Sequence, residues 1–209
     1  MIKEGIDISH WNNDAGPINF KKVAASGISF VIIKAGGSDA GFYKDKNFEE
    51  NYAAATAAGL DVGAYYFIGP KMLTKKDAEA DAKRFYNIIK GKKFSMPVYL
   101  DLETSDPKDK EAATKAAIYF MRWLEKKGYF VGIYASDLSG FRDRVDGKQL
   151  TDFTLWVARY GSEPTNMKKW DVWQYTSTAY VTGITGRVDR NYMRRDLPAI
   201  IRKAHKNNY

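Results

Sequence analysis

The sequence predicts an α/β fold, an irregular TIM-like barrel with eight strands and about five helices. As far as Ser136, short apolar segments alternate with amphipathic segments of helical length, the pattern of a mainly parallel sheet. Beyond Ser136 further apolar segments follow, with little room for full helices between them. The length of 209 residues fits one domain, so we expect a single domain over residues 1–209.

The expected helix boundaries coincide with common start and stop signals. Pro17 occupies an early helical position that proline favours, and Gly27 ends this first helix. Gly59 ends an Ala-rich second helix, and Thr74 with Asp77 forms a capping pattern for the third, with Asp in place of Glu. After the first helix, the four later helices are expected at Asn47–Ala58, Thr74–Ile89, Asp109–Lys127 and Asp196–Lys206.

The expected strands are short and rich in β-branched and aromatic residues. The apolar run Phe30–Ile33 is typical of a strand that is buried on both faces. In chain order the strands are expected at Ile6–Ser9, Ser29–Ala35, Val62–Ile68, Val98–Glu103, Tyr129–Ala135, Thr154–Arg159, Asp171–Thr176 and Arg187–Asn191.

The composition excludes several kinds of site. The chain has no cysteine, which excludes disulfides, thiolate metal ligands and a cysteine nucleophile. With only His10 and His205, a His-rich zinc site is excluded as well. No apolar stretch approaches ~20 residues, so no membrane-spanning helix is expected. The N-terminus lacks the zones of a signal peptide, which points to another export route or to a leader already removed.

The formal net charge of +8 suggests an anionic partner. Acidic polymers of a bacterial envelope and nucleic acid are the two candidates on charge alone. The basic segment Arg194–Lys206 lacks a helix-turn-helix or RNA-binding signature, so we expect a solvated helix face there and no nucleic-acid partner.

Two acids stand at the end of the expected strand Val98–Glu103. Asp101 and Glu103 are two residues apart, so both side chains should share one strand face, roughly 6.5 Å apart along the chain. Adjacent carboxyl groups push their pKa values apart, so one stays protonated while the other is ionised. We expect Glu103 to be protonated at rest beside ionised Asp101. This is the equipment of a glycosidase, which protonates a leaving oxygen and steadies a cationic sugar.

Two further acids are expected at the same end of the barrel, because sites form at the carboxyl ends of strands. Asp7 lies in the first strand and Asp189 in the last. Either acid could instead cap a loop or pair with a basic residue. For Asp189 that alternative is strong, because Arg187 and Arg190 flank it. Four acids at the strand ends of one barrel together favour a site.

Eight stretches in a fixed order carry a family resemblance: Gly5–Ser9, Phe30–Gly36, Ala58–Phe67, Pro97–Glu103, Gly128–Ala135, Leu155–Gly161, Trp173–Ser177 and Gly186–Asn191. They are distributed along nearly the whole chain, and together they resemble glycoside hydrolase family 25, the Chalaropsis-type lysozymes or N-acetylmuramidases. One departure is Ser9–Asn13, where many members have a Gln-Gly pair in a loop that lines the groove.

The resemblance implies an irregular eight-stranded barrel that cleaves the β-1,4 bond between N-acetylmuramic acid and N-acetylglucosamine in peptidoglycan, with retention of the anomeric configuration. It implies Glu103 as general acid and base, with Asp101 stabilising the intermediate. Asp7 and Asp189 match the family's two other site acids. The intermediate could be an oxocarbenium-like centre or a ring formed by the substrate's own acetamido group, and the sequence leaves this open. No metal or other cofactor is expected.

Five further residues are expected to bind substrate. Tyr65 and Tyr134 match positions that face the family's groove, and Trp173 lies near a strand end. Aromatic rings there can stack on sugar faces, although ordinary core packing is an equal alternative for each ring, and Trp156 could have either role. Gln174 must find hydrogen bonds if it is buried, and Asn191 lies in the last strand beside Asp189.

The partner expected from the resemblance is bacterial peptidoglycan, with anionic wall polymers as a further candidate. The chain is expected to act as a monomer, away from membranes and outside the cell, as a phage or prophage endolysin or a processed secreted enzyme. One alternative is a catalytically inactive peptidoglycan-binding module on the same fold, because fold does not guarantee activity.

Overall fold

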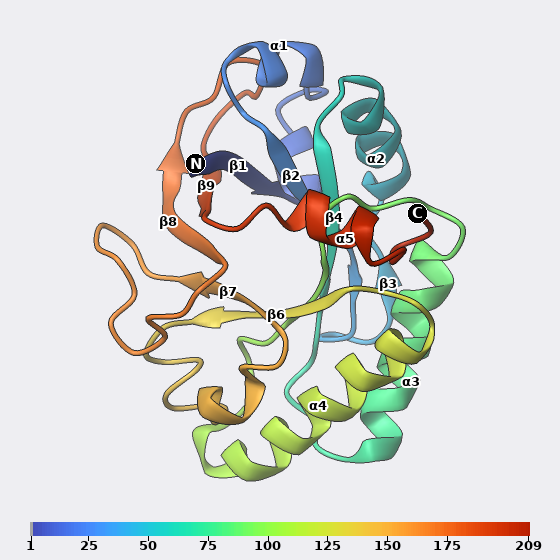
Figure 1. The fold of residues 1–209 in the computed structure, drawn as a ribbon, viewed down its shortest axis with the longest axis vertical. Coiled ribbons are helices and arrows are strands. Elements are labelled where there is room, and N and C mark those ends of the chain that lie inside the picture. The colour runs from blue at the N-terminus through green and yellow to red at the C-terminus, as the bar shows by residue number, and fades with distance from the viewer. Residues whose placement is uncertain (1) are drawn as a thin grey trace.

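Strands close into a barrel in the computed structural model, which describes residues 2–209 (Figure 1). The sheet runs in the order β1-β9-β8-β7-β6-β5-β4-β2-β3, and an additional pairing of β1 with β2 closes the ring and leaves β3 outside it. The strands are β1 Lys3–Ile8, β2 Phe30–Gly37, β3 Tyr43–Lys44, β4 Asp61–Phe67, β5 Val98–Asp101, β6 Val131–Ser136, β7 Thr154–Ala158, β8 Val172–Ala179 and β9 Val188–Met193.

The helices cover only part of the barrel. They are α1 Phe20–Ala25, α2 Phe48–Ala57, α3 Lys75–Ile89, α4 Lys110–Lys126 and α5 Leu197–Lys203, with short 3-10 turns at His10–Asn13, Pro107–Asp109 and Gly147–Leu150. In Figure 1, α2, α3 and α4 lie on one side, whereas loops surround β7 and β8 on the other. None of the helices in residues 2–209 has the length and apolar character needed to cross a bilayer.

The predicted eight-stranded barrel with five helices is confirmed, and the differences lie at element ends. Strand β5 ends at Asp101, two residues before the predicted end. Strand β8 continues to Ala179 because it pairs with β9 in an antiparallel hairpin, through two register shifts. Strand β9 is antiparallel to β1 as well, while the other pairings within the ring are parallel.

Two apolar clusters fill the molecule, one between strands and helices and one inside the barrel. The inner cluster contains the large buried side chains of Phe30, Tyr99 and Trp156. Glycines make room for them: a Cβ on Gly5 would lie 2.4 Å from the Phe30 ring, and one on Gly132 would lie 2.5 Å from the Tyr99 ring. The interior is therefore packed, as in other small barrels, and a site can form only at its mouth.

Helix α5 covers the end of the barrel where the parallel strands begin. Leu197 belongs to the inner cluster and Ile200 packs against it. Beyond the helix, buried Asn207 donates from Nδ2 to the carbonyl of Met96 at 2.9 Å and accepts at Oδ1 from Phe130 N–H at 2.7 Å. With this end closed, the open mouth lies at the carboxyl ends of the parallel strands.

Candidate active site

The mouth of the barrel is lined by polar and aromatic side chains from successive strands. Alternation along β2 places Lys34 on the same inward face as Phe30 and Ile32. The Cα register then pairs Lys34 with Tyr65, Asp101 with Tyr134, and Tyr134 with Trp156. On the other side of the ring it pairs Asp7 with Asp189, and Gln174 with Asn191.

Asp101 and Glu103 occupy different positions at the end of β5. Asp101 is the last strand residue and is 4% exposed, and its Oδ1 has no hydrogen-bond partner within residues 2–209. Glu103 lies two residues past the strand, where its side chain reaches solvent in the cleft. The predicted strand was thus too long, but the two carboxyl groups still interact.

Burial raises the pKa of both carboxyl groups. The pKa of Asp101 lies well above its ordinary value because of burial and the neighbouring charge of Glu103, with Lys34 opposing the shift. Burial also raises the pKa of Glu103, against the opposing effects of Asp101, Lys34 and Arg144. The contact between the two carboxyl groups raises the pKa of Asp101 and lowers that of Glu103. Because the two carboxyl groups interact, the pair titrates as one unit, and the protonation of Glu103 beside ionised Asp101 stays a prediction.

Asp7 and Asp189 face each other across β1 and β9. Asp7 is 6% exposed and accepts hydrogen bonds from Gln174 Nε2 at 3.0 Å and from Asn191 Nδ2 at 2.8 Å. Gln174 Nε2 also lies 3.3 Å from Asp189 Oδ2. Arg190 pairs with Glu4, and no ion pair joins Asp189 to a basic side chain within the described part of the chain. The alternative that a flanking arginine neutralises Asp189 therefore finds no support.

Burial is also the main cause of the raised pKa of both acids in this second pair. Burial and the charge of Asp189 raise the pKa of Asp7 well above its ordinary value, although the hydrogen bonds from Asn191 and Gln174 oppose this. Burial raises the pKa of Asp189 too, while its contact with Asp7 lowers it. The mouth holds two carboxyl pairs, each able to retain a proton at a higher pH than an isolated acid.

The predicted substrate-binding residues hold the acids through a shared network. Gln174 Oε1 accepts from the hydroxyl of Tyr134 at 2.9 Å and from that of Tyr160 at 3.2 Å. Asn191 Oδ1 accepts from Trp156 Nε1 at 2.8 Å. Both amides are thus bonded at their oxygen and nitrogen ends. Their positions indicate that they orient Asp7 and Asp189, because few of their polar atoms remain free for a sugar.

Tyr65 belongs to the mouth, whereas Trp173 does not. The Tyr65 ring meets Trp156 edge-on, with centroids 6.0 Å apart. The Trp173 side chain points to the face of β8 opposite that of its neighbour Gln174, because adjacent strand residues point to opposite sides. Its Nε1 donates to the carbonyl of Arg159 at 2.7 Å, and its ring packs against Trp170 and Tyr192. The structure therefore does not bring Trp173 to the other predicted residues.

A cleft of about 420 Å³ opens beside Glu103, and Tyr134, Ala158 and Tyr160 contribute to its lining. Tyr160 is 57% exposed, so its ring is available to a ligand while its hydroxyl is held by Gln174. Sequence reasoning missed Tyr160 and Lys34. Lys34 could have been found from its alternation with Phe30 and Ile32, which places a cation at the inward end of β2.

Exposed Trp11 marks another part of the rim. It lies in the 3-10 turn after β1 and is 71% exposed, with its ring centroid 4.5 Å from that of His10. His10 is anchored by buried Asp45, whose Oδ2 lies 2.9 Å from Nδ1 and 3.0 Å from the backbone nitrogen. Within residues 2–209, no group of three or more His, Cys, Asp or Glu side chains is arranged to hold a metal ion.

Neutralising Asp7 is expected to stabilise the protein while impairing the site. A carboxyl with a raised folded-state pKa contributes most stability below its unfolded pKa and loses it as pH rises through the folded pKa. Asn at position 7 can still accept from Gln174 and Asn191 without a buried charge. We expect Asp7→Asn to raise the free energy of unfolding at pH 7 by roughly 0.5–2 kcal/mol.

Urea titrations of both proteins across pH 4–8 test this expectation, and the gain should shrink toward acid pH. Asp143→Asn is a suitable control, because the ion pair with Arg142 lowers the pKa of exposed Asp143 and reverses the sign of the effect. A loss of stability in Asp7→Asn at pH 7 would show that the buried charge is fully compensated.

Comparison with known proteins gives one consistent result. A model of the family described as glycosyl hydrolases family 25 matches residues 6–184. Lysozyme M1 of Streptomyces globisporus is 31% identical, over 90% of this chain and 66% of that protein. The autolytic lysozyme of Clostridium acetobutylicum is 28% identical, over 89% of this chain and 54% of that protein. The chain thus spans slightly under two thirds of one curated relative and about half of the other.

Solved structures agree in fold. A bacterial lysozyme from Streptomyces coelicolor superimposes with a TM-score of 0.80 at 28% identity, covering 99% of this chain and 97% of that one. The modular autolysin LytC from Streptococcus pneumoniae, solved with a synthetic peptidoglycan ligand, gives a TM-score of 0.76 at 27% identity, over 92% of this chain and 47% of that one.

Proposed function

The chain belongs to glycosyl hydrolases family 25, and from this premise we propose that it is a lysozyme that hydrolyses the β-1,4 bond between N-acetylmuramic acid and N-acetylglucosamine in peptidoglycan. The observation that carries the proposal is the interacting pair of Asp101 and Glu103 at the open mouth, both with a raised pKa. The curated relatives are lysozymes, and LytC was solved with a synthetic peptidoglycan ligand. We further propose that residues 1–209 form one catalytic domain.

In the proposed mechanism Glu103 is the general acid, because it reaches the cleft while Asp101 is buried. A bound glycan excludes water and raises the pKa of Glu103 further, so that its carboxyl is protonated when it meets the glycosidic oxygen. Glu103 gives this proton to the leaving oxygen. It then takes a proton from the water that attacks the anomeric carbon.

Asp101 stabilises the positive charge that develops at the sugar, as an oxocarbenium-like centre or a cyclic acetamido intermediate. Lys34 and Asp7 both influence the pKa of Asp101, so its charge depends on the whole cluster. Asp7 and Asp189, held by Gln174 and Asn191, orient water or sugar hydroxyls at the opposite wall. Both proposed routes retain the anomeric configuration.

Product analysis tests the proposal. Purified cell walls digested by the protein are expected to yield reducing ends on N-acetylmuramic acid, with the anomeric configuration retained at early times. Mass spectrometry identifies the new reducing sugar and rapid NMR reads its anomer. Reducing N-acetylglucosamine ends or an initially inverted anomer would contradict the assignment. Binding to walls without any cleavage would instead indicate an inactive peptidoglycan-binding module.

The charge distribution supports anionic wall polymers as a second partner. Exposed lysines gather where α3, α4 and α5 end, at the closed end of the barrel: Lys90, Lys93, Lys126, Lys127 and Lys203. None of these lysines forms an ion pair within residues 2–209. This face lies opposite the acidic mouth, so it can contact a polyanion while the mouth engages glycan. We propose that the protein acts outside the cell on the bacterial wall as a monomer, as an endolysin or processed secreted enzyme.

Lysis of intact cells is expected to fall with rising salt. Attraction between exposed charges weakens as the Debye length shrinks from ~10 Å at 0.1 M to ~3 Å at 1 M. Hydrolysis of a small neutral muropeptide analogue should change much less, because its chemistry takes place inside the mouth. Turbidity loss and chromatographic product yield measure the two rates in the same salt series. Whole-cell lysis that stays constant with salt would leave the lysines without a role in attachment.

A further inference from the structure

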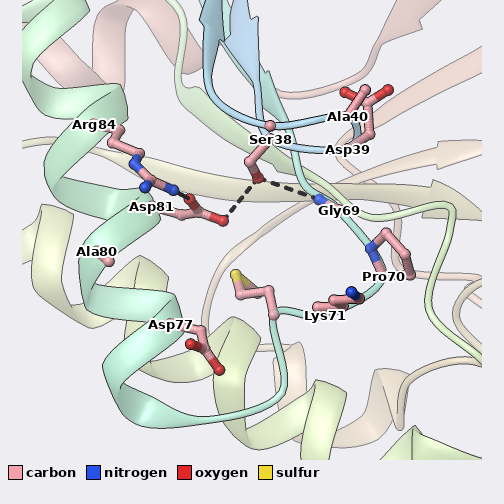
Figure 2. Close-up of a pocket in the computed structure, with 12 residues that line it drawn as sticks. Ser38, Asp39, Ala40, Gly69, Pro70, Lys71, Asp77, Ala80, Asp81 and Arg84 are labelled. Carbon is pink, nitrogen blue, oxygen red and sulfur yellow. Dashed lines mark hydrogen bonds and ion pairs between the residues drawn. The ribbon is translucent and has the colours of Figure 1, made fainter.

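A second hollow, of about 480 Å³, opens at the same end of the barrel as the acids. Its walls come from the loop that follows β2, the loop that follows β4 and the first half of α3 (Figure 2). This volume lies within the range of roughly 300–1,000 Å³ that is typical of small-ligand sites. The mechanism proposed above makes no use of it.

The back wall of this hollow is fixed by a buried hydrogen-bond chain. Asp81, 6% exposed, accepts from the hydroxyl of Ser38 and from Nη1 of Arg84, both at 2.8 Å. The Ser38 hydroxyl in turn accepts from the backbone N–H of Gly69 at 3.3 Å, which ties the two loops together (Figure 2). A Cβ at Gly69 would lie 2.6 Å from the Ser38 carbonyl oxygen, so the loops require a glycine there. The hollow is thus preformed.

Charges of both signs remain available at the edge of the hollow, and exposed Asp39 in its lining is a further carboxylate without an ion pair in residues 2–209. Asp81 and Arg84 neutralise one another, whereas exposed Lys71 forms no ion pair within the described residues. Asp77 Oδ2 accepts from the backbone N–H and from the hydroxyl of Thr74, the residue that caps α3. Asp77 Oδ1 has no hydrogen-bond partner within residues 2–209. Lys71 and Asp77 lie on opposite sides of the hollow (Figure 2). A ligand that carries both a carboxylate and an ammonium group matches this arrangement.

The hollow is directly linked to the strand end that bears the acids. Ile68, which precedes Gly69 in its wall, donates its backbone N–H to the carbonyl of Asp101 at 3.0 Å. The hydroxyl of Thr104 donates to the carbonyl of Ile68 at 3.2 Å. The wall of the hollow and the segment that bears Asp101 and Glu103 are therefore neighbours at the mouth of the barrel.

We propose that this hollow binds the peptide stem carried by the glycan, with a stem carboxylate at Lys71 and a stem ammonium at Asp77. The inference rests on the proposed function, because the substituent of muramic acid in peptidoglycan is a short peptide with free carboxylate and ammonium groups. The hollow then makes the enzyme prefer glycan that still bears its stems. Glycan without stems keeps only the lactyl carboxylate of muramic acid, directly beside the sugar, and lacks the stem's ammonium and its more distant carboxylate, so it gains nothing from this contact.

Kinetics on two substrates test the proposal. Lys71→Ala and Asp77→Asn are compared with the wild type on soluble glycan strands with intact stems and on the same strands after an amidase has removed the stems. Asn at position 77 keeps a capping side chain, and Lys76→Ala is the matched control, since Lys76 is an exposed lysine nearby that does not line the hollow. We expect each test variant to raise KM for stem-bearing glycan by roughly 3- to 10-fold with kcat unchanged. Stem-free glycan should show no change, and Lys76→Ala should resemble the wild type on both substrates.

Equal effects on both substrates, or none on either, would overturn the proposal. A binding measurement separates its failure from failure of the proposed function. A muramoyl tripeptide ending in a free lysine is titrated calorimetrically into Glu103→Gln with and without Lys71→Ala. Weaker binding in the double variant supports the stem site even if no peptidoglycan is cleaved. Equal affinity in both proteins refutes the stem site even if the wild type is an active lysozyme.

Discussion

Glu103→Gln is expected to lower lytic turnover by at least ~10²-fold, the usual contribution of a general acid. Glutamine has nearly the same shape as glutamic acid but has no acidic proton for the glycosidic oxygen. The fold should be unaffected, because Glu103 lies beyond the end of β5 and reaches solvent in the cleft. Because burial raises the pKa of Glu103, its charge is unfavourable at neutral pH, and the substitution removes that charge.

Initial rates on purified cell walls, with circular dichroism melting on the same samples, measure this effect. Glu111→Gln is a matched control, since Glu111 is an exposed glutamate on α4 that pairs with Lys115. The control should retain full activity. A folded Glu103→Gln that lyses walls at the wild-type rate would falsify the assignment of the general acid.

Asp137→Ala is expected to cause the largest loss of stability, lowering the free energy of unfolding by roughly 3–5 kcal/mol. Asp137 is 1% exposed in the cleft wall and accepts from Arg159 Nη1 at 2.9 Å. It also accepts from the backbone N–H groups of Thr165 at 2.9 Å, Met167 at 2.8 Å and Asn166 at 3.2 Å. Alanine leaves these backbone donors without a partner and removes the carboxylate that pairs with Arg159, so the loop after β7 loses its anchor.

Thermal melting measures this loss, and for a chain of this size it corresponds to a fall in Tm of roughly 6–20 °C. Asp143→Ala breaks an Asp–Arg ion pair at the exposed surface and should change Tm far less. A Tm within 2–3 °C of the wild type, which corresponds to about 1 kcal/mol, would show that the anchor is dispensable.

The pH dependence of the same pair of proteins gives an independent check. Burial raises the pKa of Asp137, but hydrogen bonds from the backbone N–H groups of Met167 and Thr165 and from the Arg159 side chain outweigh it and hold the pKa below its usual value. A depressed folded-state pKa gives stability that is present above the unfolded value of about 3.9 and is lost as pH falls through the folded value. The stability difference between wild type and Asp137→Ala should therefore narrow below about pH 4.

The acids of the mouth and Asp137 illustrate opposite uses of buried charge. Asp137 is satisfied by several donors, so its charge stabilises the fold. Asp7 and Asp101 are buried beside other carboxyl groups, and their pKa values rise. Such an arrangement costs stability at neutral pH, and it supplies the protonated groups that acid catalysis requires.

The barrel fold and the acids at its mouth could be predicted from the sequence alone. Apolar segments of strand length, proline and glycine at helix ends and the eight family-like stretches were sufficient, because they depend on local preference and on chain order. The acids could be placed at one end for the same reason, since the carboxyl ends of parallel strands meet at one end of a barrel. Asp7, Asp101, Glu103 and Asp189 all lie there.

The contacts between side chains and the burial of each acid depend on the tertiary structure. Trp173 and Gln174 are neighbours in sequence, yet they point to opposite faces of β8, so Trp173 faces outward and Gln174 contacts Asp7. Asp101 is buried and Glu103 reaches the cleft because β5 ends at Asp101, which leaves Glu103 two residues beyond the strand. Burial and the distances between charges depend on how distant segments pack, and local sequence does not encode them.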